Sequence, residues 1–230
     1  MGLTKSKGNM YPWVTHTWNP IKGCGYACPY CYVKSMKERY GYDNTVRLDE
    51  KELSTNLGKD RTIFVGSMGD MWGPWVSTAW IKAVMNHCLK FPLNHYVFQT
   101  KNPSRYQSVI FRYLHHLKEK VILGTTIETD QYPNSFESNA PSIESRYNWM
   151  TRFPAWIQKF VTIEPIMDFR VKTLIDMMRN IRPNFVAIGA DSKGHGLIEP
   201  PREKVEKLID ALGEEGIEIR QKKNLDRLKK

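Results

Sequence analysis

The chain has 230 residues, of which 41% are hydrophobic and 12% aromatic, so a disordered protein is excluded and a sizeable folded core is expected. Its 34 Lys and Arg residues outnumber its 24 Asp and Glu residues. The net charge of +10 favours a polyanionic partner, with nucleic acid ahead of an anionic membrane surface, although a merely basic protein has the same composition. No apolar run approaches the roughly 20 residues of a membrane span and no apolar signal segment opens the chain, so a cytoplasmic protein is expected.

Short apolar runs, rich in β-branched and aromatic residues, recur along the chain and predict buried parallel strands. In chain order these runs are 13–17, 63–65, 96–98, 121–123, 160–163, 185–188 and 217–219. Apolar residues at spacings of three and four predict helices between the runs. These helices are expected over 76–91, 106–117, 171–181 and 205–212.

This alternation is typical of successive βαβ units with right-handed crossovers. About six to seven mainly parallel strands indicate an α/β fold, an incomplete (β/α) barrel, because a complete eight-fold barrel usually has about 250 residues. A doubly wound open sheet is the alternative. Since the sequence shows no linker and no internal repeat, we expect residues 1–230 to form a single domain.

Two segments differ from this pattern. Residues 129–152 are polar and follow the fourth predicted strand, at the carboxyl edge where α/β proteins build their sites, which predicts a lid-like loop or a substrate loop. Residues 217–230 carry six basic and two acidic residues. This terminal segment is therefore either a solvated tail or part of a surface that binds a polyanion.

Three of the four cysteines, Cys24, Cys28 and Cys31, lie within eight positions. Without an export signal, this spacing favours metal or redox chemistry over disulfides. Three thiolates can hold three irons of a [4Fe-4S] cluster and leave the fourth iron open. Cys88 falls on the apolar face of a predicted helix, so we expect it in the core. A structural zinc site completed by His16 is the alternative.

The motif over 23–32, Gly-Cys-Gly-Tyr-Ala-Cys-Pro-Tyr-Cys-Tyr, resembles the signature of the radical S-adenosylmethionine (SAM) superfamily, in which an aromatic residue, here Tyr30, precedes the third cysteine. The segment 17–24, Thr-Trp-Asn-Pro-Ile-Lys-Gly-Cys, is similar to a phage-associated radical-SAM family related to the spore photoproduct lyase branch, which repairs DNA lesions. The resemblance implies a [4Fe-4S] cluster whose open iron binds S-adenosyl-L-methionine. Reductive cleavage of SAM would then give a 5′-deoxyadenosyl radical that abstracts hydrogen from a substrate, with electrons from a donor such as flavodoxin or ferredoxin.

The resemblance also implies that residues at the ends of the predicted strands bind the cofactor. The candidates are Tyr30, Gly66, Ser67, Gly69, Asp70, Lys101, Thr126, Glu128, Glu164 and Gly189. The segment that contains Asp70 departs from the family's Gly-Gly-Glu-like pattern, and Asp70 is the acid expected to pair with the SAM ammonium. Lys101 is expected to meet the SAM carboxylate, whereas Thr126 and Glu128 share a strand face and suit the ribose hydroxyls. An ordinary turn, a solvated lysine and a salt bridge of Glu164 are the alternatives.

Aromatic and basic residues near the predicted site favour a nucleic-acid substrate, because aromatic faces stack on bases and arginines meet phosphates. These residues are Trp72, Trp75, Tyr132, Arg146, Tyr147, Trp149 and Arg152. We therefore expect a radical-SAM lyase or transferase that repairs or modifies nucleic-acid bases. A radical-SAM enzyme acting on a peptide or small molecule and a non-catalytic, zinc-stabilised nucleic-acid-binding protein are the alternatives.

Overall fold

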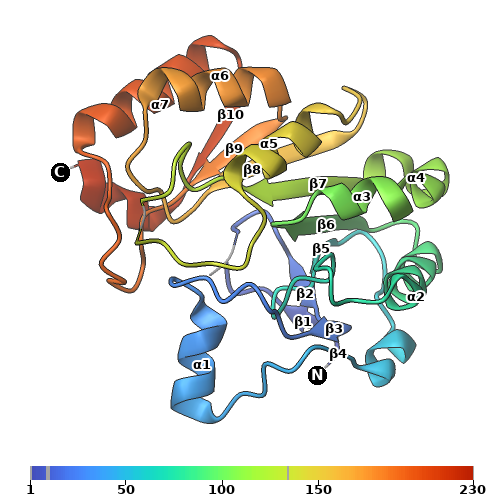
Figure 1. Ribbon diagram of the computed structural model, residues 1–230. Helices are drawn as coiled ribbons and strands as arrows, with labels where there is room; N and C mark the ends of the chain where they lie inside the picture. The colour runs from blue at the N-terminus through green and yellow to red at the C-terminus, as the bar shows by residue number, and fades with distance from the viewer. Residues whose placement is uncertain (1, 9–10, 134, 230) are drawn as a thin grey trace. The chain divides into compact units, whose positions relative to one another are not determined.

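The computed structural model describes residues 2–8, 11–133 and 135–229. These residues contain an eight-stranded, mainly parallel sheet with the strand order β1-β2-β5-β6-β7-β8-β9-β10, and a two-stranded sheet of β3 and β4 (Figure 1). The strands are β1 (Thr4–Lys5), β2 (His16–Trp18), β3 (Ile21–Lys22), β4 (Arg47–Leu48), β5 (Thr62–Val65), β6 (His95–Thr100), β7 (Val121–Thr126), β8 (Gln158–Ile163), β9 (Phe185–Ile188) and β10 (Glu218–Gln221). The α/β class and the mainly parallel sheet are thus confirmed. The eight-stranded sheet has one strand more than the predicted six to seven, and this additional strand is β1.

The helices occupy the predicted intervals and add several that the sequence pattern did not indicate. They are α1 (Tyr32–Tyr40), α2 (Thr78–Leu89), α3 (Ser104–Val109), α4 (Phe111–Leu117), α5 (Ile143–Thr151), α6 (Val171–Ile181) and α7 (Arg202–Glu214), with the 3-10 helices η1 (Glu50–Ser54), η2 (Lys118–Lys120) and η3 (Lys223–Lys229). The helix expected over 106–117 is divided into α3 and α4 at Ile110. Among the residues described, no helix has both the length and the apolar character that a membrane span requires.

The chain divides into two compact units, and the boundary falls within β7. Unit 1 comprises Met1–Ala27 and Cys31–Leu123, and unit 2 comprises Cys28–Tyr30 and Gly124–Lys230. The middle of the cysteine motif therefore clusters with unit 2, whereas its two ends cluster with unit 1.

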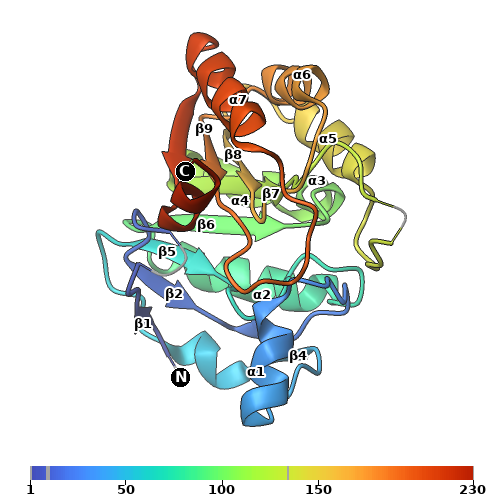
Figure 2. The ribbon, with the colours of Figure 1, turned by 90° about the vertical axis from the view of Figure 1, so that its left-hand side faces the viewer.

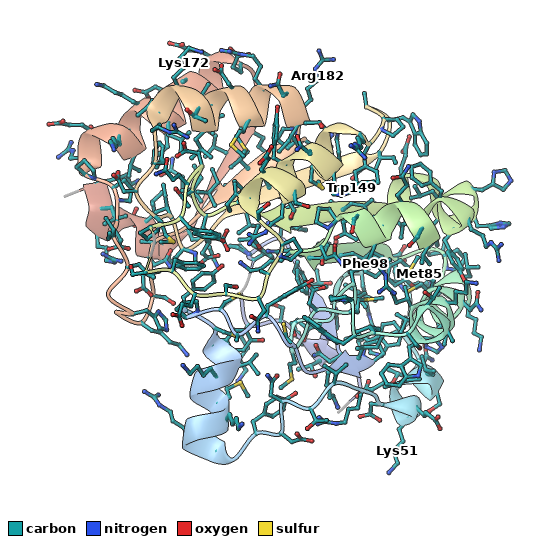
Figure 3. All side chains as sticks on the ribbon, viewed as in Figure 1. Lys51, Met85, Phe98, Trp149, Lys172 and Arg182 are labelled. Carbon is teal, nitrogen blue, oxygen red and sulfur yellow. The ribbon has the colours of Figure 1, made fainter. Side chains whose placement is uncertain are left out.

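The core of unit 1 forms between its strands and α2. In the sheet, β2, β5 and β6 run parallel, with Thr17 opposite Phe64 and Phe64 opposite Val97 (Figure 2). Phe98 of β6 and Met85 of α2 are both fully buried, and Figure 3 labels both side chains. Helix α2 begins where the Ser77 side chain accepts a hydrogen bond from the backbone N–H of Trp80, which satisfies one of the free donors at its first turn.

The core of unit 2 forms where α6 and α7, which lie side by side, cover the strands (Figure 1). The residues of α6 that face this core are Leu174, Met177, Met178 and Ile181. Lys172 and Arg182, at the two ends of α6, instead point outward (Figure 3). The periodicity predicted for 171–181 is therefore confirmed, because one apolar face is buried and the other carries charge.

The basic terminal segment is built into unit 2. Its first part forms β10, which pairs in parallel with β9, and its second part forms η3. Several of its cations are in ion pairs, among them Lys222 with Glu164 and Arg227 with Glu199. The described part of the segment is therefore not a loose tail, and Lys230 lies outside the described residues.

Candidate functional site

The cysteine motif occupies the connection between β3 and α1. Its cysteines are thiols, with Cys28 buried and Cys24 and Cys31 partly exposed. Cys88 lies in α2 and is fully buried, which confirms its expected place in the core. Burial raises the pKa of the Cys88 thiol above its ordinary value, so this residue stays protonated and does not suit a thiolate ligand.

The donor set of the motif is three thiols within eight positions. Among the described residues, no group of three or more His, Cys, Asp and Glu side chains converges on one point where an ion could sit. Thiolates are the ligands of a [4Fe-4S] cluster, and each one binds a different iron, so the chemistry of these three side chains fits such a cluster. His16, the expected fourth zinc ligand, lies in β2 opposite Ile63, and its Nδ1 is 2.9 Å from the hydroxyl of Thr15.

Within unit 1, the start of the motif lies directly against the glycine-rich segment that follows β5. Gly23 and Gly69 form an isolated parallel bridge, and the N–H of Gly23 donates to the carbonyl of Met68 at 3.1 Å. A Cβ atom on Gly69 would come within 2.5 Å of the Gly23 carbonyl oxygen, and Gly23 itself has a φ of +85°. Both positions therefore require glycine, and the close approach fixes the entry to the cysteine loop.

Two side chains hold the same glycine-rich segment in place. The Oδ1 atom of Asn19 accepts hydrogen bonds from the Ser67 hydroxyl at 3.0 Å and from the Met68 N–H at 2.9 Å. The hydroxyl of Tyr32 donates to the Ser67 carbonyl. Two cofactor candidates, Ser67 and Gly69, are thus brought beside the motif, whereas the N–H of Gly66 donates to the Trp18 carbonyl at 2.9 Å. Sequence reasoning missed the role of Asn19, although its position directly after β2 was a usable signal.

Asp70 follows this segment and is buried. Its carboxylate accepts from the Thr100 hydroxyl at 2.7 and 2.8 Å, and from the backbone N–H groups of Lys101 and Trp72 at 3.0 Å each. Burial raises the pKa of Asp70 above its ordinary value, although these hydrogen bonds oppose the rise. Asp70 therefore ties the end of β6, where Lys101 lies, to the segment after β5. Its pairing with a SAM ammonium stays a prediction.

Within unit 2, Glu128 is fully buried and is the centre of a hydrogen-bonded network just beyond β7. Its carboxylate accepts from Arg146 at 2.8 Å, from the Tyr132 hydroxyl at 2.7 Å and from the hydroxyl of Tyr30 in the cysteine motif. Burial, and then the Glu128 carboxylate, raise the pKa of Tyr132 above its ordinary value. Burial alone would lower the pKa of Arg146, but the carboxylate raises it above its ordinary value. Arg146 is therefore charged and Tyr132 is a neutral donor.

The remaining candidates in unit 2 lie at the ends of β7, β8 and β9. The Thr126 side chain is buried, and its backbone carbonyl accepts from Arg146 at 2.9 Å. Glu164 pairs with Lys222 at 2.7 Å, which is the ion pair that the sequence left open as an alternative. A Cβ atom on Gly189 would come within 2.8 Å of the Glu164 carboxylate, so glycine is needed there to admit that side chain.

The polar segment after β7 is only partly irregular, because its second half forms α5. Ser142 caps this helix by accepting from the N–H of Ser145 at 3.1 Å. Glu128 follows the end of β7, whereas Trp149 and Arg152 precede the start of β8, with the Arg152 guanidinium 4.5 Å above the Trp149 ring. A helix that connects parallel neighbours returns the chain to the opposite edge of the sheet.

The expected gathering of aromatic and basic residues is therefore only partly correct. Trp149 and Arg152 lie at the edge away from Glu128, and the Tyr147 hydroxyl instead accepts a hydrogen bond from Asn180 of α6. In unit 1, Trp72 is a fully buried core residue that packs edge-on against Phe98. Trp75 packs in the same manner against Tyr26. Tyr132 is the predicted loop aromatic whose hydroxyl contacts a candidate residue, Glu128.

Comparison with solved structures shows a shared fold at low sequence identity. A mutant spore photoproduct lyase superposes with a TM-score of 0.66 and 12% identity, covering 96% of this chain and 78% of that chain. A mutant lyase with bound AdoMet and dinucleoside spore photoproduct gives 0.58 and 14%, covering 92% and 63%. SuiB from Streptococcus suis, bound to its precursor peptide SuiA, gives 0.63 and 11%, covering 90% of this chain and 48% of that chain, so this chain spans about half the length of SuiB.

Comparisons by sequence give one match. Residues 9–223 match the family model described as "Protein of unknown function (DUF5131)". No curated protein matches the chain.

Proposed function

The chain belongs to the DUF5131 family, and we propose that it is a radical-SAM enzyme. The observation that carries this proposal is a three-thiol loop whose first residues are held against a glycine-rich segment by the bridge between Gly23 and Gly69. The fold shared with spore photoproduct lyase and SuiB supports the same conclusion. In this proposal Cys24, Cys28 and Cys31 hold a [4Fe-4S] cluster.

The chain's own residues bind and orient SAM in this proposal. When bound, the cluster and SAM supply a radical that abstracts hydrogen from the substrate. The SAM-binding residues proposed in unit 1 are Gly66, Ser67, Gly69, Asp70 and Lys101, and those in unit 2 are Tyr30, Thr126, Glu128, Glu164 and Gly189. Glycines let backbone carbonyls approach the ligand, and Lys101 supplies a cation for its carboxylate. An external donor such as flavodoxin or ferredoxin supplies the electron.

The cluster assignment is tested by anaerobic reconstitution of cysteine variants. Cys24→Ala, Cys28→Ala and Cys31→Ala should each abolish cluster binding and reductive cleavage of SAM. Cys88→Ala is the matched control and should keep full iron content, because Cys88 lies in the core of α2. Iron content, the visible absorption of the cluster and the yield of 5′-deoxyadenosine are the measurements.

Two results would contradict this assignment. An intact, active cluster in Cys28→Ala would remove the three-ligand assignment. Stoichiometric zinc in a colourless wild-type protein would favour the zinc-stabilised binding protein instead.

For the substrate we propose a nucleic acid, with base repair or modification as the outcome. Helix α1, directly after the third cysteine, exposes Lys34, Lys37 and Arg39, and its last residue, Tyr40, is 77% exposed. Cations that meet phosphates and an aromatic ring that stacks on a base are the usual elements of single-strand binding. One similar lyase structure carries a dinucleoside spore photoproduct. The precursor peptide in the SuiB structure keeps a peptide substrate as the second candidate.

Binding titrations with single-stranded and duplex DNA and RNA at several salt concentrations test the substrate class. The variant Lys34→Ala/Lys37→Ala/Arg39→Ala should reduce the log–log salt slope by about 0.7 per lost contact on a single strand. A control removes three other exposed cations, Lys172, Arg182 and Lys207, and should leave the slope unchanged.

No nucleic-acid binding tighter than about 100 μM at low salt would remove the nucleic-acid proposal. Stimulation of SAM cleavage by peptide or small-molecule pools, and not by nucleic acid, would favour the second candidate.

A further inference from the structure

The segment after β7 contacts the middle of the cysteine motif at three points within unit 2. The Tyr30 hydroxyl donates to Glu128, and the Tyr30 ring lies 6.1 Å from the ring of Phe136. The Sγ atom of Cys28 lies 3.5 Å from the hydroxyl oxygen of Ser138. Phe136 and Ser138 belong to residues 129–152, the segment that the sequence predicted to be a lid-like loop, and here they contact the motif.

The direction of the hydrogen bond between Cys28 and Ser138 follows from the protonation state of the cysteine when it binds iron. The Ser138 oxygen accepts a hydrogen bond from the backbone N–H of Ala140 at 3.2 Å, so its own O–H can be donated. A thiolate that binds iron has no S–H and can only accept. With Cys28 in that form, Ser138 is the donor and Cys28 the acceptor.

The hold on Tyr30 is rigid because the groups around it are fixed in turn. Glu128 and Arg146 are both 0% exposed, and Arg146 also donates to the Thr126 carbonyl at 2.9 Å and to the backbone carbonyl of Pro141 at 2.8 Å. The rings of Tyr132 and Phe136 stack at 4.0 Å with an interplanar angle of 6°. The buried ion pair therefore anchors both ends of the segment that contacts the motif.

We propose that Glu128 and Ser138, from the segment after β7, position the cysteine motif: Ser138 donates a hydrogen bond to the Cys28 thiolate, and Glu128 fixes Tyr30, the residue that precedes Cys31. This inference rests on the proposed function, because it takes Cys28 as a cluster ligand. A hydrogen bond to a ligand sulfur stabilises negative charge there, and reduction adds negative charge to the cluster. Ser138 therefore raises the reduction potential of the cluster, which makes it a positioning residue and not a catalytic one.

The test is a redox titration of the reconstituted protein, followed by the electron paramagnetic resonance signal of the reduced cluster. Ser138→Ala should keep the wild-type iron content and shift the midpoint potential to a more negative value. Ser138→Thr keeps the hydroxyl and should restore the potential. Ser135→Ala, an exposed serine of the same segment, is the matched control and should not shift it.

A second measurement tests the hold on Tyr30 without relying on the potential. Tyr30→Phe keeps the ring beside Phe136 and removes the hydroxyl that binds Glu128, so iron should be lost to a chelator faster than from the wild type. The control Tyr147→Phe also removes a tyrosine hydroxyl that makes a side-chain hydrogen bond, here with Asn180, and should lose iron at the wild-type rate.

The two possible failures have different signatures. A wild-type protein that takes up no cluster contradicts the proposed function. A wild-type cluster whose potential is unchanged in Ser138→Ala, at equal iron content, overturns the inference about Ser138. Equal rates of iron loss from wild type and Tyr30→Phe overturn the inference about Glu128.

Discussion

Two buried carboxylates, Asp70 in unit 1 and Glu128 in unit 2, perform similar tasks with different partners. Each follows a strand and ties neighbouring segments together. Among the described residues, the Asp70 carboxylate accepts from uncharged donors alone, the Thr100 hydroxyl and two backbone N–H groups. Glu128 accepts from two tyrosine hydroxyls and from the guanidinium of Arg146.

The difference concerns charge and not the number of hydrogen bonds. Burial raises the pKa of Asp70, so its carboxyl group can become neutral without leaving a buried cation behind. Replacing Glu128 with a neutral residue would leave the guanidinium of Arg146, which is 0% exposed, without its carboxylate partner. Substitutions that remove charge should therefore cost much more at Glu128 than at Asp70.

The largest effect is expected for Glu128→Gln. Removing one partner of a buried ion pair usually costs about 3–5 kcal/mol, because the remaining charge is buried without compensation. Urea unfolding followed by tryptophan fluorescence measures this loss. The double variant Glu128→Leu/Arg146→Met removes both charges and should recover most of the stability. A double variant as unstable as Glu128→Gln would show that the ion pair is not the cause.

A smaller effect is expected for Asp70→Asn, about 1–3 kcal/mol, because the amide turns one acceptor into a donor that faces the Lys101 N–H. The raised pKa of Asp70 means that the folded protein binds its proton more tightly than the unfolded chain. The contribution of Asp70 to the free energy of unfolding of the wild type therefore falls as pH rises from 3.8 through the pKa of the folded protein. The destabilisation caused by Asp70→Asn should become smaller over the same pH range. A cost equal to that of Glu128→Gln in the same urea assay would contradict the comparison.

Much of the fold was predictable from the sequence, because buried parallel strands appear as continuous apolar runs and amphipathic helices as periodic ones. The helix predicted over 171–181 has the bounds of α6. The strands β1, β3 and β4 have two residues each, too few for a pattern. Helix α5 was missed because its buried face includes Arg146, which a hydrophobicity pattern counts as polar.

The candidate site was predictable where its residues are close in sequence. The spacing of Cys24, Cys28 and Cys31 is visible directly, as is the glycine-rich segment after β5. The partners of the two carboxylates were not predictable, because they depend on tertiary packing. The sequence led us to interpret Arg146 as a phosphate-binding residue. It lies 18 positions from Glu128, and in the structure its guanidinium binds the Glu128 carboxylate. The residue type of an arginine does not indicate whether its side chain is buried or exposed.

The smallest effect on stability is expected at His87, a buried histidine, and it extends the comparison of the two units from carboxylates to histidines. His195 of unit 2 has its Nδ1 2.6 Å from the Asp191 carboxylate, whereas His87 of unit 1 donates from Nε2 to the Thr55 carbonyl at 2.8 Å, and its buried Nδ1 has no hydrogen-bond partner among the described residues. Burial lowers the pKa of His87 below its ordinary value of 6.5.

Between the lowered pKa of folded His87 and 6.5, the unfolded chain binds the proton more readily than the folded protein, so stability falls as pH falls through this window. His87→Gln removes the contribution of this histidine to the pH dependence of stability. The difference between the urea midpoints of the variant at pH 7.5 and 5.5 should therefore be smaller than in the wild type. His116→Gln, at an exposed position of α4, is the matched control and should keep the wild-type difference. An equal pH dependence in wild type and His87→Gln would show that the acid sensitivity of the fold does not arise at this buried ring.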